Sequence, residues 1–289
     1  MHIAIMLWGF TAIFGKLIHL DEGLLVWYRM FLSALAMGIF LAFQKKLRGI
    51  SPKQVLPIAG IGAIITLHWI TFYGAIKASN VSIAISCFSS VALFTAVLDP
   101  LLKRKRPSLR ELGLGLAVIA GIFIIFSGQR LYLKGILLSI ASAFLASLFT
   151  ILNKRISNKV EPGIITLFEI GTGFLLLTIC LPVWMYINNS GFAWPTASDM
   201  VYLLLLSVAC TTVAFTLSLY ALQKIDAFTM NLSVNLEPLY SIVLAFILFN
   251  EYQLLNFSFY AGSFIILAAV LLHGSLLLKQ ARQKKEDLI

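Results

Sequence analysis

The feature that most constrains this chain is its division into long apolar stretches that contain almost no charge. Cutting the sequence at its charged and turn-forming clusters leaves ten stretches of about 20 largely apolar residues, the length that an α-helix needs to cross a membrane. Hydrophobic residues make up 60% of the chain and charged residues only 12%, too few charges to cover a soluble domain. The composition excludes an ordinary soluble protein and predicts an all-α polytopic membrane protein.

The ten predicted transmembrane helices account for nearly the whole chain. We place them near residues 2–18, 24–44, 55–76, 79–102, 109–127, 133–153, 163–187, 199–222, 227–249 and 255–279. The first stretch lacks a basic leader and a small-residue cleavage site, so we interpret it as a retained span. Because Cys87, Cys180 and Cys210 lie inside apolar stretches without CxxC spacing, we expect no disulfide framework, no metal and no other cofactor.

The distribution of lysine and arginine predicts the orientation of the chain. Of the 22 basic residues, 17 fall in the loops after even-numbered spans or in the C-terminal segment. Cytoplasmic loops carry such an excess, so both termini are expected on the cytoplasmic side of the cell (inner) membrane. The net charge of +10 then reflects orientation and contact with membrane lipids, and no nucleic-acid partner is expected.

The second half of the sequence matches the first at shifts of 140 to 149 residues. In chain order, segment 23–29 resembles 163–169, Tyr73 and Lys77 recur as Tyr220 and Lys224, and Gly113 corresponds to Gly262. These matches predict two five-helix repeats, residues 1–127 and 128–279, followed by a basic cytoplasmic tail at 280–289. Five is an odd number of crossings, so the repeats would be inverted, as in many secondary transporters. A chance match between apolar segments is the alternative.

Several short motifs resemble those of a known family. They are Trp8-Gly9, Arg29, Leu236-Glu237-Pro238, Phe249-Asn250-Glu251, and glycines such as Gly121 and Gly262. Their order and spacing resemble the EamA-type branch of the drug/metabolite transporter (DMT) superfamily. The resemblance implies ten helices in two inverted repeats around a central pathway lined largely by helices one, three, four, six, eight and nine. It also implies transport, often efflux, of amino acids, other small metabolites or drugs.

Two positions depart from the family pattern. Ser89 stands where the first repeat would match Pro238, and Leu102 stands opposite Glu251. Asp99, close to Leu102, is a candidate local substitute for the missing carboxylate.

Glu237 is the strongest single candidate for function. It lies about ten residues into the ninth span, close to the midplane, where an ionised side chain costs about 2.5–3.5 kcal/mol. It is expected either to bind a substrate amine or exchange a proton, or to bond a neighbouring helix as a neutral carboxyl. Pro238 beside it would free the carbonyl of Val234. On a helical wheel Asn231, Asn235 and Pro238 share one face and Glu237 lies on another, which predicts a central helix with two polar faces.

Arg29 and Glu169 occupy equivalent positions about five to six residues inside opposite ends of the second and seventh spans. We expect Arg29 either to hold backbone carbonyls or the nearby Asp21 and Glu22, or to contact an anionic group of a substrate. Glu251 lies within about one turn of a helix end, so its side chain is expected to reach water.

A stripe of ring-bearing side chains in the third span is a further candidate. His68 and Trp69 are followed one turn later by Phe72 and Tyr73, a spacing that puts them on one side of a helix. The stripe is either packing or the apolar wall of a small-molecule site, and His68 is either a satisfied core residue or a proton site. Further candidates are Tyr220 and Asn153, which would continue the wall, and Trp8 of the family motif.

The sequence favours a carrier over two other classes of protein. It contains no HExxH, Walker or aspartate-rich metal motif, so we expect no enzyme and no direct ATP drive. The expected function is secondary transport of a small molecule by alternating access, through facilitated diffusion or exchange with protons. One alternative is an intramembrane enzyme acting on a lipid-linked group, with Glu237, His68 and Arg29 as acid, base and phosphate clamp. Their scattered depths argue against it. A passive channel or scaffold is the other, and no filter motif supports it. The oligomeric state is not predicted.

Overall fold

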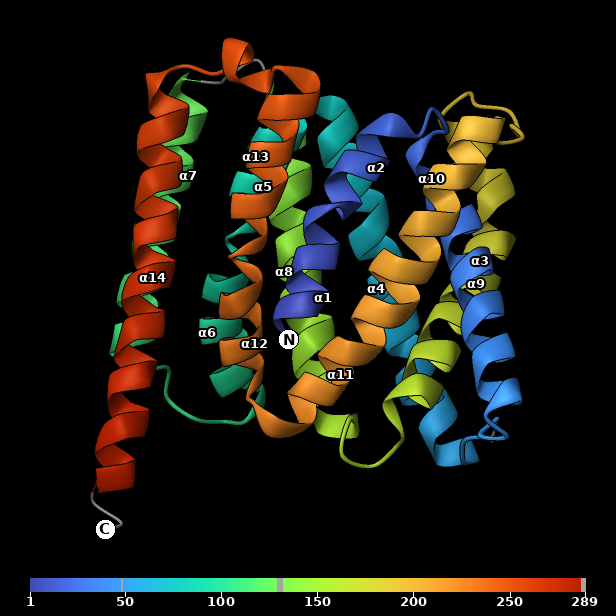
Figure 1. Cartoon of the computed structure of the whole chain (residues 1–289), viewed down its shortest axis with the longest axis horizontal. Helices are drawn as coiled ribbons and strands as arrows, with labels where there is room; N and C mark the ends of the chain where they lie inside the picture. Colours follow the sequence, from blue (N-terminus) through green and yellow to red (C-terminus); the bar gives the residue numbers. More distant parts are fainter. Residues whose placement is uncertain (48, 129–131, 287–289) are drawn as a thin grey trace.

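The computed structural model describes residues 1–47, 49–128 and 132–286, which form a helical bundle without a β-strand (Figure 1). In chain order its helices are α1 (His2–Gly9), α2 (Thr11–Leu17), α3 (Glu22–Phe43), α4 (Pro52–Ala78), α5 (Val81–Phe88), α6 (Val91–Leu102), α7 (Leu109–Gly128), α8 (Leu133–Ile156), α9 (Pro162–Ile187), α10 (Ala197–Ser207), the π-helical turn η2 (Val208–Val213), α11 (Ala214–Lys224), α12 (Ala227–Val234), α13 (Glu237–Phe249), the 3-10 turn η3 (Glu251–Leu254) and α14 (Phe257–Glu286).

Six helical segments of the described chain are long and apolar enough to cross a membrane: Glu22–Phe43, Pro52–Ala78, Val81–Leu102, Leu133–Ile156, Pro162–Ile187 and Ala197–Lys224. Shorter apolar helices cover His2–Leu17, Tyr240–Phe249 and Phe257–Ala269. The chain is therefore an integral multi-pass membrane protein, as its composition predicts. The number of ten crossings stays a prediction.

Four of the predicted spans are built from more than one helical piece. Residues 2–18 form α1 and α2, residues 79–102 form α5 and α6, residues 199–222 form α10, η2 and α11, and residues 227–249 form α12 and α13. Apolar periodicity continues across these joints, so it could not predict them.

Acidic and amide side chains begin several helices. Asp21 accepts hydrogen bonds from the backbone N–H groups of Gly23 and Leu24 at 2.9 and 3.0 Å, at the start of α3. Asn80 and Asp226 cap α5 and α12 in the same way, at 2.8 and 2.7 Å. Such caps satisfy backbone donors that have no partner inside the helix.

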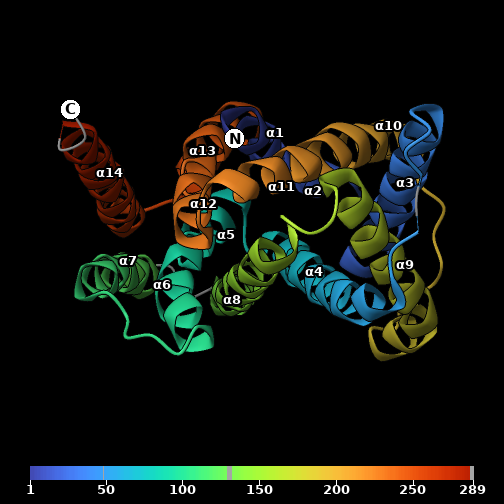
Figure 2. The ribbon, with the colours of Figure 1, turned by 90° about the horizontal axis from the view of Figure 1, so that it is seen from below.

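The bundle has a pair of helices at each edge and a group of helices between these pairs (Figures 1 and 2). In both views α7 and α14 stand side by side at one edge and α3 and α9 at the opposite edge (Figures 1 and 2). Glycine permits the contact between α7 and α14, because a methyl group on Gly121 would lie 2.7 Å from the carbonyl oxygen of Gly262. This edge pair lies away from the centre of the bundle, where α4, α8 and α11 meet the two broken helices.

The loops that follow α3, α6, α8 and α11 all lie at one end of the bundle, which we call the basic end (Figure 1). Hydrogen bonds join them: Gln223 Nε2 donates to the Ser157 carbonyl at 2.7 Å, and Arg155 Nη2 donates to the Leu102 carbonyl at 3.1 Å. Most of the described basic residues gather there.

Some of the basic residues on which the predicted orientation rests lie outside the residues that the structure describes. Arg48 and Arg130 lie outside the described residues, as do 287–289 of the predicted tail. The rest of that tail, which we expected to follow the last helix, continues α14 as far as Glu286.

A polar network that we call the end latch lies at the opposite end of the bundle. Glu251 accepts hydrogen bonds from Lys16 Nζ at 2.7 Å and from the backbone N–H of Val81 at 3.1 Å. Its other oxygen accepts from the Ser82 N–H at 2.9 Å and from the Ser82 hydroxyl at 2.7 Å. The latch joins α2, the start of α5 and η3.

The end latch corrects the expectation that Glu251 reaches water, because the residue is fully buried. Its carboxylate is held instead by the unpaired N–H groups and the positive end of α5. At the basic end the matching position is Leu102, which has no such side chain.

Candidate functional site

Two helices break near the middle of the bundle. α5 ends at Phe88 and α6 begins at Val91, and α12 ends at Val234 and α13 begins at Glu237. At both joints the backbone changes to tighter bonds between residues three apart, such as the 3.0 Å bond from Asn235 N to Leu232 O. Pro238 therefore lies in the first turn of α13, where proline costs no hydrogen bond, and not inside a continuous helix as predicted.

The second break changes which side chains share a face. In a continuous helix Asn231 and Glu237 would lie about 120° apart, on different faces. Each tighter step turns the chain by about 20° more, so the two such bonds, from Asn235 N to Leu232 O and from Leu236 N to Ser233 O, bring the two side chains closer together. Asn231 and Glu237 accordingly line the same cavity. The predicted face of Asn231, Asn235 and Pro238 is wrong for this reason.

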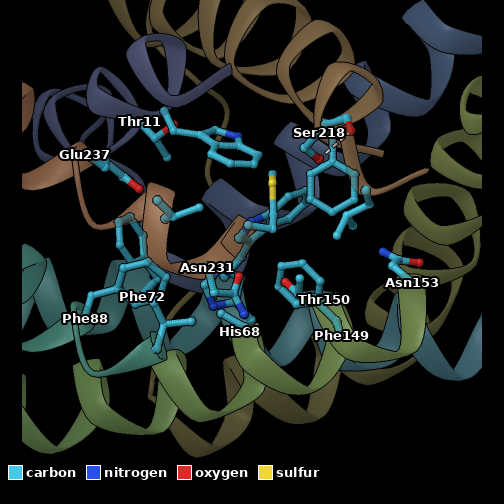
Figure 3. Close-up of a pocket in the computed structure, with 18 of the residues that line it drawn as sticks. Thr11, His68, Phe72, Phe88, Phe149, Thr150, Asn153, Ser218, Asn231 and Glu237 are labelled. Atoms are coloured by element: carbon cyan, nitrogen blue, oxygen red, sulfur yellow. Dashed lines mark hydrogen bonds between the residues drawn. The ribbon is translucent and has the colours of Figure 1, made fainter. Parts of the chain in front are cut away.

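A cavity of about 70 Å³ lies between the broken helices and α4, α8 and α11 (Figure 3). It has room for roughly five water molecules. Ring side chains make up much of its wall: Trp8, Trp69, Phe72, Phe88, Phe149 and Phe215. Its polar side chains include Thr11, Arg29, His68, Asn153, Asn231 and Glu237. An apolar pocket with a few polar groups is the usual composition of a small-molecule site.

Arg29 is a buried cation without a carboxylate partner among the described residues. Its Nε donates to the Thr211 hydroxyl at 2.7 Å and its Nη1 donates to the Tyr73 hydroxyl at 2.6 Å. The guanidinium carbon lies 3.8 Å from the ring centre of Trp69, a cation–π contact. Asp21, one of the partners we considered, caps α3 instead. Arginine has five N–H donors, and these bonds leave donors for a further acceptor.

The π-helical turn η2 makes this arrangement possible. The Thr211 hydroxyl donates to the carbonyl of Leu206, five residues earlier, at 2.8 Å, and so presents its oxygen to Arg29. Single π-helical turns are often found at functional sites. Nothing in the spacing of the apolar residues indicates such a turn.

Glu237 is 4% exposed and its carboxyl points into the cavity, near Thr11 (Figure 3). It makes no ion pair with a described residue, although Arg29 lines the same cavity. The Thr11 hydroxyl is itself buried, and no oxygen or nitrogen of the described residues bonds it. This end of the cavity therefore holds a carboxyl and a hydroxyl whose bonding capacity is unused.

His68 is both a packed residue and a cavity residue. Its Nδ1 lies 3.0 Å from the Ser142 carbonyl and 2.8 Å from the Ser142 hydroxyl. The ring packs against Phe72, Phe88 and Phe149, with ring centres 6.0, 5.6 and 5.3 Å away. A donating Nδ1 leaves Nε2 as an acceptor.

Asn231 connects the cavity to a chain of hydroxyls. Its Nδ2 donates to the Thr95 Oγ1 at 2.7 Å, and Thr95 bonds the Ser147 hydroxyl at 2.9 Å. These bonds tie α12 to α6 and α8, so the wall on this side is held by polar contacts between helices.

At the far end of the cavity from Glu237 stands Asn153 (Figure 3). Behind it lies Glu169 of α9, which is fully buried and accepts a 3.4 Å hydrogen bond from Asn153 Nδ2. The prediction placed Arg29 and Glu169 at equivalent positions. In the structure Arg29 lies on the cavity wall and Glu169 lies one side chain behind it.

Besides Glu169, four predicted site residues do not line this cavity. Tyr73 lies behind the wall and holds Arg29 through its hydroxyl. Pro238 is buried beside Glu237, and Asn235 lines a separate small pocket against α6, α7 and α14. Tyr220 is 44% exposed on α11 and does not continue the wall.

Several residues of the wall were not predicted. On α11, Phe215, Ser218, Leu219 and Leu222 line the cavity. Their spacing of three, one and three residues is typical of one helix face and could have indicated a shared surface. Which surface that face meets follows only from the position of α11 against α8 and α12.

The three residues of the enzyme alternative, Arg29, His68 and Glu237, all line the same cavity. That they lie at different depths in the membrane stays a prediction. The breaks in the helices and the length of the arginine side chain bring them to one place.

Comparisons with known proteins give a family, a relative and a similar fold. The model of the EamA-like transporter family matches residues 1–127 and 133–274. An uncharacterized transporter from Archaeoglobus fulgidus is 28% identical over 286 residues, covering 93% of this chain and 94% of that protein. A crystal structure of a protein 18% identical in sequence superposes with a TM-score of 0.67, over 97% of this chain and 96% of the other. At that identity the likeness concerns the fold alone.

Proposed function

We propose a transport mechanism for this chain, which belongs to the EamA-like transporter family. The protein is a secondary carrier of small zwitterionic metabolites such as amino acids, which bind in the cavity between Arg29 and Glu237. The single observation that carries the proposal is the buried guanidinium of Arg29, which lines the cavity and has no carboxylate partner among the described residues.

The charges of the cavity match those of a zwitterion. A buried cation is stable only when an anion or enough acceptors surround it, and two hydroxyls are few for a guanidinium. A solute carboxylate supplies the anion that Arg29 lacks, with the two-pronged geometry that arginine favours. A solute ammonium group does the same for the carboxylate of Glu237.

The walls and the size of the cavity restrict the solute further. Rings of Trp69, Phe72 and Phe149 offer an apolar surface to a short side chain. The cavity volume of about 70 Å³ fits a solute of few non-hydrogen atoms. The site therefore favours small amino acids over larger drug-like compounds.

Alternating access follows from the two inverted repeats that the sequence predicts. In support, Arg29 and Glu169 each lie eight residues after an acidic residue at a helix start, Asp21 and Glu161. Both repeats also contain a broken helix at the cavity. Rocking about such breaks would open the cavity first to one side of the membrane and then to the other.

The same proposal includes the location and direction of transport. The basic end faces the cytoplasm, with both termini on that side of the inner membrane. Solute moves outward, driven by its own gradient or by exchange with protons.

An untargeted liposome assay tests whether the protein is a carrier. The purified chain is reconstituted in liposomes loaded with a mixed metabolite extract, and mass spectrometry identifies what leaves faster than from protein-free liposomes. Selective loss of small amino acids is the expected result. Loss of another class would refute the zwitterion site, and no selective loss from folded protein would favour the enzyme or scaffold alternatives.

Two variants then assign the charged groups. The solute is compared with its decarboxylated amine and its deaminated acid in competition assays. Arg29→Met should abolish the preference for the amino acid over its decarboxylated amine. Affinity for the amino acid should fall by about 2–5 kcal/mol, or at least 30-fold. Glu237→Gln should abolish the preference for the amino acid over the deaminated acid and stop transport, while expression and folding stay intact. If Glu237→Gln fails to insert or unfolds in detergent, the residue is structural.

A further inference from the structure

Glu169 is a buried carboxyl that the proposed solute site does not use. Its only hydrogen-bond partner among the described residues is Asn153, whose Nδ2 donates to Oε2 over 3.4 Å. The two remaining oxygens of the pair, Glu169 Oε1 and Asn153 Oδ1, are both buried without a partner. Both of these oxygens are acceptors, so what the pair lacks is a hydrogen.

We propose that Glu169 and Asn153 form a proton-binding site. A proton on Glu169 Oε1 turns that oxygen into a donor, for which Asn153 Oδ1 is the free acceptor. The bond from Asn153 Nδ2 to Oε2 is kept. The carboxylic acid and the amide then pair through two hydrogen bonds, and the buried carboxyl carries no charge.

Among the residues that the structure describes, the helices around Glu169 offer no cation that could replace the proton. α9 packs against α3, α4 and α11, and Asn153 brings α8 to the same point. The basic groups of these helices have other partners or reach the surface. Arg29 of α3 bonds Thr211 and Tyr73, His68 of α4 bonds Ser142, and Lys154 of α8 donates to the Leu222 carbonyl. The others are exposed: Lys53 and Lys77 of α4, Lys134 and Arg155 of α8, and Lys224 of α11. A deprotonated Glu169 is therefore an unpaired buried charge.

The site has a route to the cavity. Asn153 lines the cavity at the end away from Glu237 (Figure 3). Glu169 does not line the cavity but bonds the Asn153 amide, which does. Rotation of this one amide exposes the carboxyl to cavity water. Water then takes the proton as hydronium or returns it, and no other reactant is needed.

A role of Glu169 in coupling solute transport to protons rests on the proposed carrier function. The proton-binding site itself does not depend on that function. Solute would bind between Arg29 and Glu237, and the proton would bind at Glu169. The solute would occupy groups of the cavity and the proton a carboxyl behind its wall, so one can leave while the other enters. This assigns the exchange of solute for protons to a residue other than the solute-binding carboxyl.

Infrared difference spectroscopy tests the site without any transport. The full chain in lipid bilayers is titrated with acid, and the carbonyl stretch of a protonated carboxyl is followed. We expect one such band to be absent in Glu169→Gln, whose neutral amide replaces the neutral acid and should let the chain fold. The matched control Glu237→Gln removes the carboxyl that lines the cavity and should retain the band.

A second variant keeps the test valid if Glu169→Gln does not fold. Asn153→Leu removes the donor to Oε2, so the Glu169 band should remain but move to higher frequency, as for a carbonyl that no longer accepts a hydrogen bond. A band unchanged in both variants, or one lost in Glu237→Gln instead, overturns the proposal.

A transport assay then distinguishes the proposed carrier function from the proposed proton site. If the wild type carries solute, Glu169→Gln should still exchange labelled for unlabelled solute, but a pH gradient should no longer drive accumulation. Gradient-driven accumulation that persists in this variant overturns the coupling role. If the wild type carries nothing while the band behaves as expected, the proposed function fails and the proton site stands.

Discussion

Replacing Glu251 by alanine tests how much the end latch contributes to stability. The carboxylate is fully buried and accepts the four hydrogen bonds of the latch. Without it the backbone N–H groups of Val81 and Ser82 remain buried without an acceptor, at about 1–3 kcal/mol each. Lys16 adds little, because its side chain is 34% exposed and can be hydrated. We expect Glu251→Ala to lower the free energy of unfolding by about 3–5 kcal/mol, the usual range for a broken buried pair.

A second ion pair of the same length supplies the control. Lys103 Nζ and Asp99 Oδ2 are 2.7 Å apart, as are the charged atoms of Lys16 and Glu251, but the Lys103 and Asp99 side chains are 42% and 15% exposed. Pairs of this kind contribute about 0.3–0.5 kcal/mol, so Asp99→Asn should change stability by no more than that. Glu251→Gln should lose less free energy of unfolding than Glu251→Ala, because the amide oxygen of glutamine still accepts a hydrogen bond.

Reversible unfolding by SDS in mixed micelles, followed by tryptophan fluorescence, measures all three variants on one scale. A loss in Glu251→Ala below about 1 kcal/mol, the value of one ordinary hydrogen bond, would refute the reasoning. So would a loss equal to that of Asp99→Asn, since burial would then make no difference.

Gly262→Val should separate α7 from α14, because its side chain would collide with the backbone of Gly121; we expect a loss of about 1–3 kcal/mol in the same SDS titration. Gly60, around which a new side chain meets nothing within 4 Å, is the control, and an equal loss in Gly60→Val would contradict the packing argument. Replacing the basic residues at 103–105 by glutamine should disturb the orientation of the chain in reporter fusions and leave solute affinity unchanged. Unchanged topology would count against the orientation argument.

Much of the fold could be predicted because it depends on local composition. Apolar length predicts where helices lie, and clusters of lysine and arginine predict which loops meet at one end. The breaks at Ser89 and Asn235 could not be predicted, since both residues also occur inside helices and only packing against other helices selects the joint. The same holds for the π-helical turn at Val208–Val213.

The candidate site was predictable as a set of unusual residues but not as a geometry. Arg29, His68, Asn231 and Glu237 are conspicuous because polar groups in lipid are costly, and all four line the cavity. The partners that hold Arg29 lie 44 and 182 residues away in the chain, and no spacing rule connects such distances. Burial of Glu251 escaped prediction for the same reason, because its acceptor role depends on a helix start 169 residues away.

If the protein carries solute as proposed, the end latch would give the two sides of the cavity different apparent affinities. Solute arriving from the latched end meets an accessible site only in the fraction of molecules whose latch has opened, and its apparent dissociation constant rises in inverse proportion to that fraction. Solute arriving from the basic end, where Leu102 replaces the latching carboxylate, meets no such penalty. A carrier with one latched end thus has a high-affinity side and a low-affinity side built from the same binding residues, and half-saturation measured from each side would differ although the bound solute touches the same atoms.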